Sequence, residues 1–409
     1  MSDTATAPAP ALLPARAELR RLLPLFAGRG AYRLIIALSN VALAAAWGPR
    51  TFAGYAAAMG SLAVLSFLTS LGVEKSALKL VPRARRTGSE LMAAFVSLPA
   101  VLGAACLGWV AVAATDALTL GAGALAVGLG ANQVLVALHR VRDRPGLDVA
   151  NHGILVAGLL ATTLAALAGG LGPVGFIGWT VLLVAGLNAA LLAALRPWRL
   201  RLPRRSVLRA AAGTSLLMSA GEVAAAAVVS LVFVVLAHSA YRDQAGALYL
   251  AVGVSSLLVK AFGYLLRVVQ PRVSVALHPA GAGTAVQTRA ARGARLVVLL
   301  GTPYLVLVTA AAVLAVRAGL GAPVVVLVLL YLGCAPLIFG VGTINFLLEN
   351  AGRAALRRTA VGSVAGLAAA VPAGYLLITL FGAPGGLAAI AVGELVHAAA
   401  VLHVPERQL

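Results

Sequence analysis

The sequence predicts an all-α polytopic membrane protein of about twelve transmembrane helices, divided into two halves of six. Of its 409 residues, 61% are hydrophobic and only 11% are charged, and the mean hydropathy is +0.98. A composition this apolar is typical of helical membrane proteins. The division into halves is indicated by the stretch 196–209, which carries six arginines and no acid near the middle of the chain.

Twelve apolar runs reach the length of about 20 residues that crosses a bilayer as a helix. The connections between them are short, and none is long enough for a separate soluble domain. We therefore predict spans at 27–47, 52–73, 91–113, 117–138, 148–169, 174–195, 210–237, 245–266, 295–316, 322–346, 359–381 and 385–403. The spacing of Gly362 and Gly366 in the eleventh span predicts a close approach to a neighbouring helix.

The stretch 196–209 marks the boundary between the two halves. Its prolines oppose a continuous helix, and its charge excludes it from the hydrocarbon. The N-terminal segment lacks a short apolar run followed by a cleavage site, so we expect a retained tail and not a signal peptide. The predicted organisation is a cytoplasmic tail at 1–26, a six-helix lobe at 27–195, a basic cytoplasmic linker at 196–209, a second lobe at 210–403 and a short tail at 404–409.

The basic residues predict the orientation in the membrane. Of the 32 lysines and arginines, 28 fall on one side of the predicted spans, among them those of a predicted loop from Lys75 to Arg86. Only Arg50, Arg242 and Arg317 fall on the other side, and Lys260 lies inside a span. Basic loops stay on the cytoplasmic side of membranes, so both termini are predicted to be cytoplasmic. The same distribution accounts for the pI near 11.5 without a nucleic-acid partner.

The sequence contains no motif of an enzyme or a metal site. No phosphate-binding loop is present, and the six histidines lack metal-ligand spacing. Cys106 and Cys334 lie far apart inside apolar runs, which supports neither a disulfide framework nor a metal site. We therefore expect no enzymatic activity, no cofactor and no metal.

Several short segments resemble polysaccharide flippases of the Wzx type. The segment 47–55, W-G-P-R-T-F-A-G-Y, resembles the turn between their first two helices. Segments 244–249 and 270–274 are similar to the opening of their second half, and 349–353 with 380–386 resemble their closing four helices. The resemblance covers nearly the whole chain. It implies the multidrug/oligosaccharidyl-lipid/polysaccharide exporter superfamily, whose members form two six-helix lobes in a V around a central cavity that opens alternately to either side.

The resemblance also implies that basic residues of the first, second and eighth helices line the cavity. Lys260 and Arg33 match this pattern by position and are the expected ligands of a headgroup phosphate, whereas the second helix offers only Arg50 at its outer end. Arg33 shares a helical face with Arg29 and Asn40. It either faces the cavity or extends to the cytoplasmic interface. For Arg29 the interface is the simpler interpretation.

Three titratable residues inside the spans are candidates for coupling or ion pairing, because charge at bilayer depth is costly. Glu222 lies in the seventh span, where it either pairs with Lys260 or binds a coupling proton or cation. Glu394 and His397 are spaced as a helical i, i+3 pair, for which a locally satisfied pair is a simpler interpretation than a pH-sensitive couple.

The remaining polar residues of the spans either contact sugar in the cavity or form hydrogen bonds between helices, and packing between helices is the simpler interpretation. They are Asn40, Asn132, Gln133, Ser219, Ser256, Tyr264 and Asn345.

These features lead to one functional hypothesis and two alternatives. The hypothesis is a bacterial cytoplasmic (inner) membrane flippase that moves a polyprenyl-pyrophosphate oligosaccharide to the outer leaflet for cell-surface polysaccharide synthesis. With the inside negative, outward movement of an anion is downhill by roughly 2.3 kcal/mol per charge per 100 mV. The first alternative is an H⁺- or Na⁺-coupled exporter of small molecules, with Glu222 as the coupling acid. The second is a membrane scaffold that recruits biosynthetic enzymes. Expected partners are the lipid-linked glycan, membrane lipids, a coupling cation, and a polysaccharide polymerase or glycosyltransferases.

Overall fold

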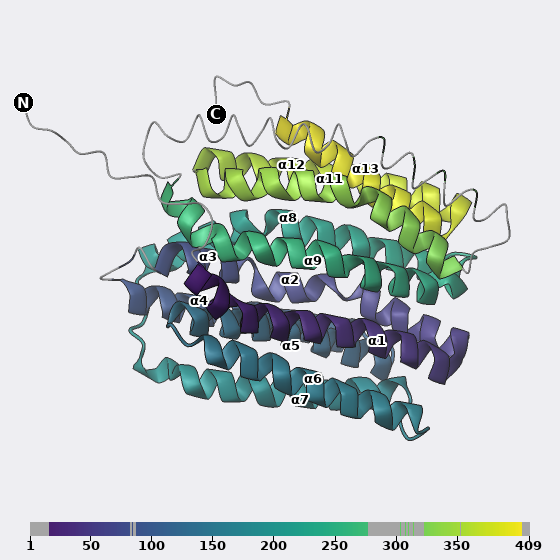
Figure 1. Cartoon of the computed structure of the whole chain (residues 1–409), viewed down its shortest axis with the longest axis horizontal. Helices are drawn as coiled ribbons and strands as arrows, with labels where there is room; N and C mark the ends of the chain where they lie inside the picture. Colours follow the sequence, from purple (N-terminus) through teal and green to yellow (C-terminus); the bar gives the residue numbers. More distant parts are fainter. Residues whose placement is uncertain are drawn as a thin grey trace, which may run out of the picture.

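The computed structural model describes residues 16–81, 84, 87–276, 323–351 and 353–402, with single positions at 303, 307, 310 and 314. The described residues form helices joined by short connections (Figure 1). The N-terminal half contains α1 (Arg16–Ser61), α2 (Val64–Ser70), α3 (Val73–Leu80), α4 (Gly88–Ala113), α5 (Ala117–Val141), α6 (Pro145–Leu167) and α7 (Pro173–Leu195). The C-terminal half contains α8 (Arg205–Ala237), α9 (Ala245–Ala276), α11 (Pro323–Ala351), α12 (Arg353–Phe381) and α13 (Ala383–Leu402). Two short 3₁₀ helices, η2 (Pro197–Arg199) and η3 (Arg242–Gln244), precede α8 and α9.

Ten helical segments of the described residues are long and apolar enough to cross a membrane. The first, Ala27–Leu80, has 54 residues, which as a straight helix would be about 80 Å long against a hydrocarbon core of about 30 Å. Gly48 breaks it with a φ of 75°, so that the chain turns back, and Glu74 of α3 lies 3.7 Å from Arg29 in the first arm of α1 (Figure 1). The predicted spans 27–47 and 52–73 therefore lie on either side of Gly48. The predicted span 295–316 lies outside the described residues except for four single positions, so the count of twelve stays a prediction.

Local sequence signals explain where several helices begin. Pro145 and Pro173 open α6 and α7, at the position where proline's missing N–H costs no hydrogen bond. Asp116 caps α5 by accepting from the Thr119 N–H at 2.7 Å, and this hydrogen bond lowers the pKa of the Asp116 carboxyl. α8 begins at Arg205, inside the predicted linker 196–209, because Pro203 is the last proline of that stretch and helix formers follow it.

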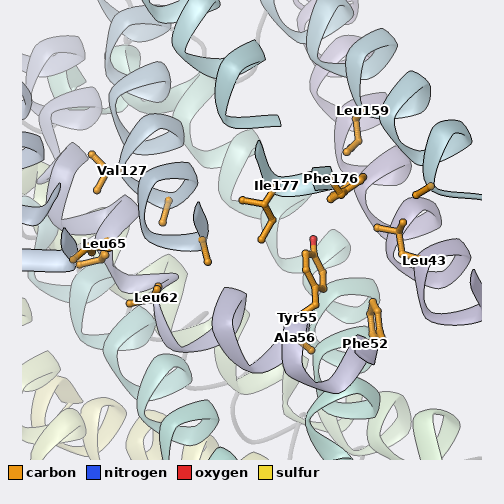
Figure 2. Close-up of a cluster of buried hydrophobic side chains, with 14 residues drawn as sticks. Leu43, Phe52, Tyr55, Ala56, Leu62, Leu65, Val127, Leu159, Phe176 and Ile177 are labelled. Carbon is orange, nitrogen blue, oxygen red and sulfur yellow. The ribbon is translucent and has the colours of Figure 1, made fainter. Parts of the chain in front are cut away.

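Each half contains a main cluster of buried apolar side chains. The N-terminal cluster joins α1, α2, α4, α5, α6 and α7, and Figure 2 shows Tyr55 and Phe52 of α1 near Phe176 and Ile177 of α7. The Tyr55 and Phe176 rings meet edge to face, with centroids 6.2 Å apart, a favourable geometry for aromatic pairs. The C-terminal cluster joins α8, α9, α11, α12 and α13.

The small-residue spacing in α12 does bring two helices together, as predicted. A Cβ built on Gly366 would lie 2.6 Å from the Gly393 carbonyl oxygen of α13, a distance that no side chain tolerates. In a bilayer, where lipid tails are as apolar as leucine, such close packing is a main source of attraction between helices. Glycine at 366 therefore permits the packing of α13 on α12.

The connections of the N-terminal half lie at two ends of the helix bundle. At one end, Arg142 after α5 donates to the Leu195 carbonyl at the end of α7 at 2.7 Å. At the other, the Trp47 indole donates to the Leu171 carbonyl at 3.0 Å, joining the turn of α1 to the α6–α7 connection. The predicted basic loops at 140–144 and 196–204 therefore meet at one end, which we call the basic end. That this end is cytoplasmic remains a prediction.

Candidate functional site

A buried ion pair joins the two halves at the basic end. Lys75 of α3 donates from Nζ to both carboxylate oxygens of Glu349 of α11, at 3.0 and 3.1 Å. The same Nζ lies 3.4 Å from Glu222 Oε1 of α8, and Lys79 donates to the Glu349 carbonyl oxygen at 2.6 Å. We call Lys75, Lys79, Glu222 and Glu349 the interhalf bridge. One lysine of the N-terminal half thus holds two carboxylates of the C-terminal half.

A break in the second predicted span directs α3 toward the other half. Leu71 and Gly72 have φ values of 36° and 61°, so two successive residues in the left-handed region end α2 and reorient α3. A Cβ built on Gly72 would lie 2.8 Å from the Ser215 carbonyl oxygen of α8. Close contact continues one turn later, where Ser76 Oγ lies 3.5 Å from Met218 Sδ. Gly72 therefore permits both the break and the approach that brings Lys75 to Glu222.

A second network lies inside the N-terminal half, and we call Arg29, Glu74, Arg140, Asp148 and His152 the N-half charge cluster. Arg29 binds Asp148 through two nitrogens, at 3.0 and 3.3 Å, and lies 3.7 Å from Glu74. Arg140 pairs with Glu74 and lies 3.3 Å from Asp148 Oδ2. His152 Nδ1 lies 2.8 Å from Asp148 Oδ1. The cluster ties together α1, α3, α5 and α6.

The charges of the N-half charge cluster balance, which favours a structural role over binding of an anion. Two arginines face two carboxylates, and the Asp148 side chain is only 1% exposed. Buried charges of this kind persist when they are mutually paired, and removal of one partner is strongly destabilising. α3 connects this cluster to the interhalf bridge, because Glu74 belongs to the first and the adjacent Lys75 to the second.

The ends of the halves that lie opposite the basic end are also in contact, through aromatic rings. The Tyr249 ring of α9 lies 6.0 Å from that of Tyr55 and 6.3 Å from that of Phe52, both in α1. Phe233 of α8 adds a ring at 5.9 Å from Tyr249. The two halves are therefore joined by an ion pair at one end and by an aromatic cluster at the other.

The structure changes the interpretation of several basic residues. Arg29 is paired with Asp148 in the first turn of α6, and its position at the membrane interface stays a prediction. Lys75 and Lys79 lie in α3 and not in a loop, since the helix continues beyond Gly72. Arg33 is partly buried, and its guanidinium lies 5.9 Å from the centroid of the Tyr32 ring. The backbone of Lys260 lies in α9, but its side chain is outside the described part of the chain.

Asn132 forms hydrogen bonds between helices, the simpler of its two interpretations. It donates to Asn151 of α6 at 3.0 Å and to Asn188 of α7 at 2.9 Å. Asn188 in turn donates to the Gly128 carbonyl of α5 at 2.8 Å. This buried amide network joins three helices, and both hydrogen bonds donated by Asn132 go to other asparagine side chains.

The other predicted polar residues have different surroundings. The Ser219 and Ser256 hydroxyls donate to carbonyls of their own helices, those of Leu216 and Gly253, at 2.9 Å. Asn40 is buried, whereas Gln133 and Asn345 are partly buried. The side chain of Tyr264 lies outside the described part of the chain. Whether any of these residues contacts a transported molecule stays a prediction.

The candidate coupling residues are distributed over two places. Glu222 contacts Lys75 in the interhalf bridge. Its pairing with Lys260, whose side chain lies outside the described part of the chain, and its binding of a coupling proton or cation both stay predictions. Glu394 and His397 do not form the expected local pair among the described residues: His397 Nε2 instead lies 3.3 Å from Ser363 Oγ of α12. His397 therefore joins α13 to α12.

Sequence reasoning missed the interhalf bridge and the N-half charge cluster, although a signal for both was present. Glu74, Asp148 and Glu349 are three of only twelve acids in a strongly basic chain, and each lies within one or two turns of the end of an apolar run. An acid in that position needs a cation nearby. The need for a partner is visible in the sequence, but its identity is not.

Comparison with solved structures identifies the fold. No protein-family model and no curated protein matches the chain. The chain is similar to the MATE multidrug transporter DinF-BH in complex with rhodamine 6G, with 15% identity and a TM-score of 0.59 over 95% of this chain and 97% of that one. It is also similar to an outward-facing multidrug resistance MATE family transporter of the MOP superfamily, with 13% identity and a TM-score of 0.55 over 97% of both chains.

A third similar structure is a MOP superfamily transporter from Pyrococcus furiosus, with 14% identity and a TM-score of 0.51 over 97% of both chains. The chain is thus a multi-pass membrane protein with the fold of MATE family transporters of the MOP superfamily. At these identities the likeness concerns the fold. The Wzx-type subfamily expected from the short sequence segments stays a prediction.

Proposed function

We propose that the protein is a membrane transporter that works by alternating access between its two halves. The observation that carries this proposal is that the halves are in contact at both ends, through an ion pair at the basic end and through aromatic rings at the other. The interhalf bridge closes the basic end through Lys75, Glu222 and Glu349, and Tyr249 with its aromatic neighbours closes the other end. Because the two sets share no residue, one can open while the other stays closed. The fold shared with MATE family transporters supports this mechanism.

The proposed cargo is a polyprenyl-pyrophosphate oligosaccharide, carried from the inner to the outer leaflet of a bacterial cytoplasmic membrane. The lipid tail would stay in the bilayer while the sugar crosses between the halves. A pyrophosphate at low dielectric needs a cation, and Lys260 with Arg33 is the proposed pair. The support is the similarity of segments 47–55 and 244–249 to polysaccharide flippases and the position of Lys260 inside α9.

Native mass spectrometry of the protein, gently extracted from its own host, tests this cargo. We expect a bound polyprenyl-pyrophosphate sugar that is lost from the Lys260→Ala variant, because the variant leaves the phosphates without a cation. Gly54→Ala is the matched control, since it is exposed with no neighbour within 4 Å of an added Cβ. Retention of the lipid-linked sugar by Lys260→Ala would remove Lys260 from the site, and bulk phospholipid alone in the wild type would contradict the cargo.

A cation-coupled exporter of small molecules is the second candidate, and the geometry of Glu222 favours it. Glu222 makes the longer of the two carboxylate contacts to Lys75, 3.4 Å against 3.0 Å, and its side chain is 26% exposed against 8% for Glu349. It is therefore the carboxylate that is more readily freed for a proton or a sodium ion when the bridge opens. Similar structures include multidrug transporters, one of them in complex with rhodamine 6G.

Efflux of rhodamine 6G from proteoliposomes separates the two candidates. The exporter predicts efflux that depends on a proton or sodium gradient, that is lost in Glu222→Gln and that persists in Lys260→Ala. The flippase predicts no gradient-dependent efflux of the dye and no loss of the bound lipid-linked sugar in Glu222→Gln.

A further inference from the structure

A pocket lined by arginines lies at the basic end, outside the interhalf bridge and the N-half charge cluster. It has a volume of about 470 Å³ and lies between the start of α4 and the ends of α5 and α7. Arg142, Arg144, Arg196 and Arg199 contribute to its lining, and no acidic residue does. Four arginines that line one open pocket form a concentration of positive charge that neither network described above contains.

The fold gathers these arginines from two connections. Arg142 follows α5 and donates to the Leu195 carbonyl at 2.7 Å, which holds the end of α5 against the end of α7. Arg196 has a φ of 52°, so the chain turns sharply after α7 and the short helix η2 carries Arg199 back to the same pocket. Burial, and then the charge of Arg144, lowers the pKa of Arg142.

The described residues provide no carboxylate to balance this charge. Glu90, near the start of α4, is engaged with Arg204: it accepts from the Arg204 backbone N–H at 3.2 Å and lies 3.6 Å from its Nε. Asp143 lies in the same turn as Arg142, but it is exposed and does not line the pocket. Like charges held together repel unless an anion joins them, so the pocket is suited to an anionic ligand.

The surroundings indicate that this ligand comes from the membrane. Trp198 and Leu202, on the connection that forms one wall, are 70% and 89% exposed. Exposed tryptophan beside arginine is typical of the headgroup region of a bilayer. The outer face of α7 leading up to the pocket is apolar and exposed, with Trp179 at 58% and Leu182 at 62%, as expected of a surface in contact with lipid tails.

We propose that this pocket binds the phosphate of an anionic phospholipid from the leaflet at the basic end. The guanidinium groups of the arginines would donate hydrogen bonds to the phosphate oxygens. Trp198 and Leu202 would lie among the neighbouring lipids. Basic pockets between helix ends on the cytoplasmic side suit such headgroups. The proposal is independent of the transported cargo, because no residue of the pocket belongs to the interhalf bridge.

Thermal unfolding of the full chain in detergent, titrated with phosphatidylglycerol, tests the proposal. Phosphatidylcholine and inorganic phosphate are the parallel titrants. We expect phosphatidylglycerol alone to raise the unfolding temperature at low concentration. In the variant Arg144→Gln/Arg199→Gln, the half-saturating lipid concentration should rise at least about tenfold, because two of the four cationic groups are removed. Both residues are exposed, so the lipid-free unfolding temperature should stay close to that of the wild type.

The matched control is Arg205→Gln/Arg209→Gln, which removes the same charge from exposed positions of α8 outside the pocket lining. It should retain the wild-type response to phosphatidylglycerol. An equal loss in both variants would mean general attraction to an anionic surface and would overturn the proposal. Equal stabilisation by inorganic phosphate and by the lipid would overturn the membrane as the source. Transport is not the readout, so failure here is distinguishable from failure of the proposed function.

Discussion

Asp148 is bound by three side chains of the N-terminal half. Arg29, Arg140 and His152 all lie within 3.3 Å of its carboxylate oxygens, and its side chain is almost fully buried. The attraction between the Asp148 carboxylate and the two arginines, Arg29 and Arg140, offsets the free-energy cost of burying these three charged groups. Removal of this carboxylate leaves Glu74 as the one carboxylate of the cluster beside two arginines, and this excess of positive charge costs more than the loss of the contacts alone.

Asp148→Asn should therefore destabilise the protein by about 3–5 kcal/mol, because the N-half charge cluster then has two arginines and only one carboxylate, Glu74. The measurement is unfolding in detergent, followed by tryptophan fluorescence. Asp143→Asn is the matched control: Asp143 is exposed, and asparagine tolerates its left-handed backbone. Equal stability of the Asp148→Asn variant and the wild type would show that the N-half charge cluster does not hold α1, α5 and α6 together.

α2 and α3 show how a helix break determines a site. Had the second span continued as one regular helix, the direction of α3 would have been fixed by α2. The left-handed residues Leu71 and Gly72 give α3 its own direction, close to α8. As a result, Glu74 faces its own half while Lys75 reaches the other.

Gly72→Ala should weaken both the fold and the interhalf bridge. The added Cβ would collide with the Ser215 carbonyl at 2.8 Å, and alanine in the left-handed region costs roughly 1–2 kcal/mol before that contact is counted. Unfolding in detergent should occur at a lower temperature than for the wild type. Gly54→Ala, in an open position of α1, should be neutral or stabilising by up to about 1 kcal/mol. A Gly72→Ala variant as stable as Gly54→Ala would contradict this account of the break.

At the scale of the whole molecule, the described residues form two bundles of helices, and the interhalf bridge is a charged link between them. Among the described residues, the N-half charge cluster is satisfied within the N-terminal half, whereas the interhalf bridge spans 274 residues of sequence between Lys75 and Glu349. Rearrangement of the halves must therefore break this bridge while it leaves the N-half charge cluster intact.

Lys75→Gln should shift the distance between the halves at the basic end to longer values, because Glu222 and Glu349 are left without their shared cation. The measurement is pulsed electron paramagnetic resonance between spin labels at Asp143 and Ala354, exposed positions of the two halves, with Cys106 and Cys334 replaced by serine. Arg205→Gln, an exposed change at the same end, should leave the distance unchanged. An unchanged distance in Lys75→Gln would show that the bridge does not hold the basic end closed.

The sequence predicted much of the architecture but little of the site. Apolar runs located most ends of the described helices to within a few residues, although α1 begins at Arg16 and α9 ends at Ala276, ten or more residues beyond the predicted spans. The segment 47–55 indicated the turn at Gly48. The assignment of Lys75 to a loop was wrong because hydropathy alone does not show that a helix continues past an apolar run. The expected pairing of Glu394 with His397 failed because helical spacing makes a contact available without making it the best one: Ser363 of another helix lies beside His397.

What the sequence determined by itself is that the protein is a helical membrane protein, and where most of its helices begin and end. The apolar composition indicates a membrane protein, and proline and glycine mark helix ends. The basic residues distinguish one end of the bundle from the other. All of these are properties of residues and their neighbours in the chain. The tertiary structure alone decided which charges meet. Lys75 pairs with Glu349, Arg29 pairs with Asp148, and four arginines from two connections line one pocket. A buried or crowded charge depends on whichever helix packs beside it, and that neighbour is set by the shape and close contact of whole helices.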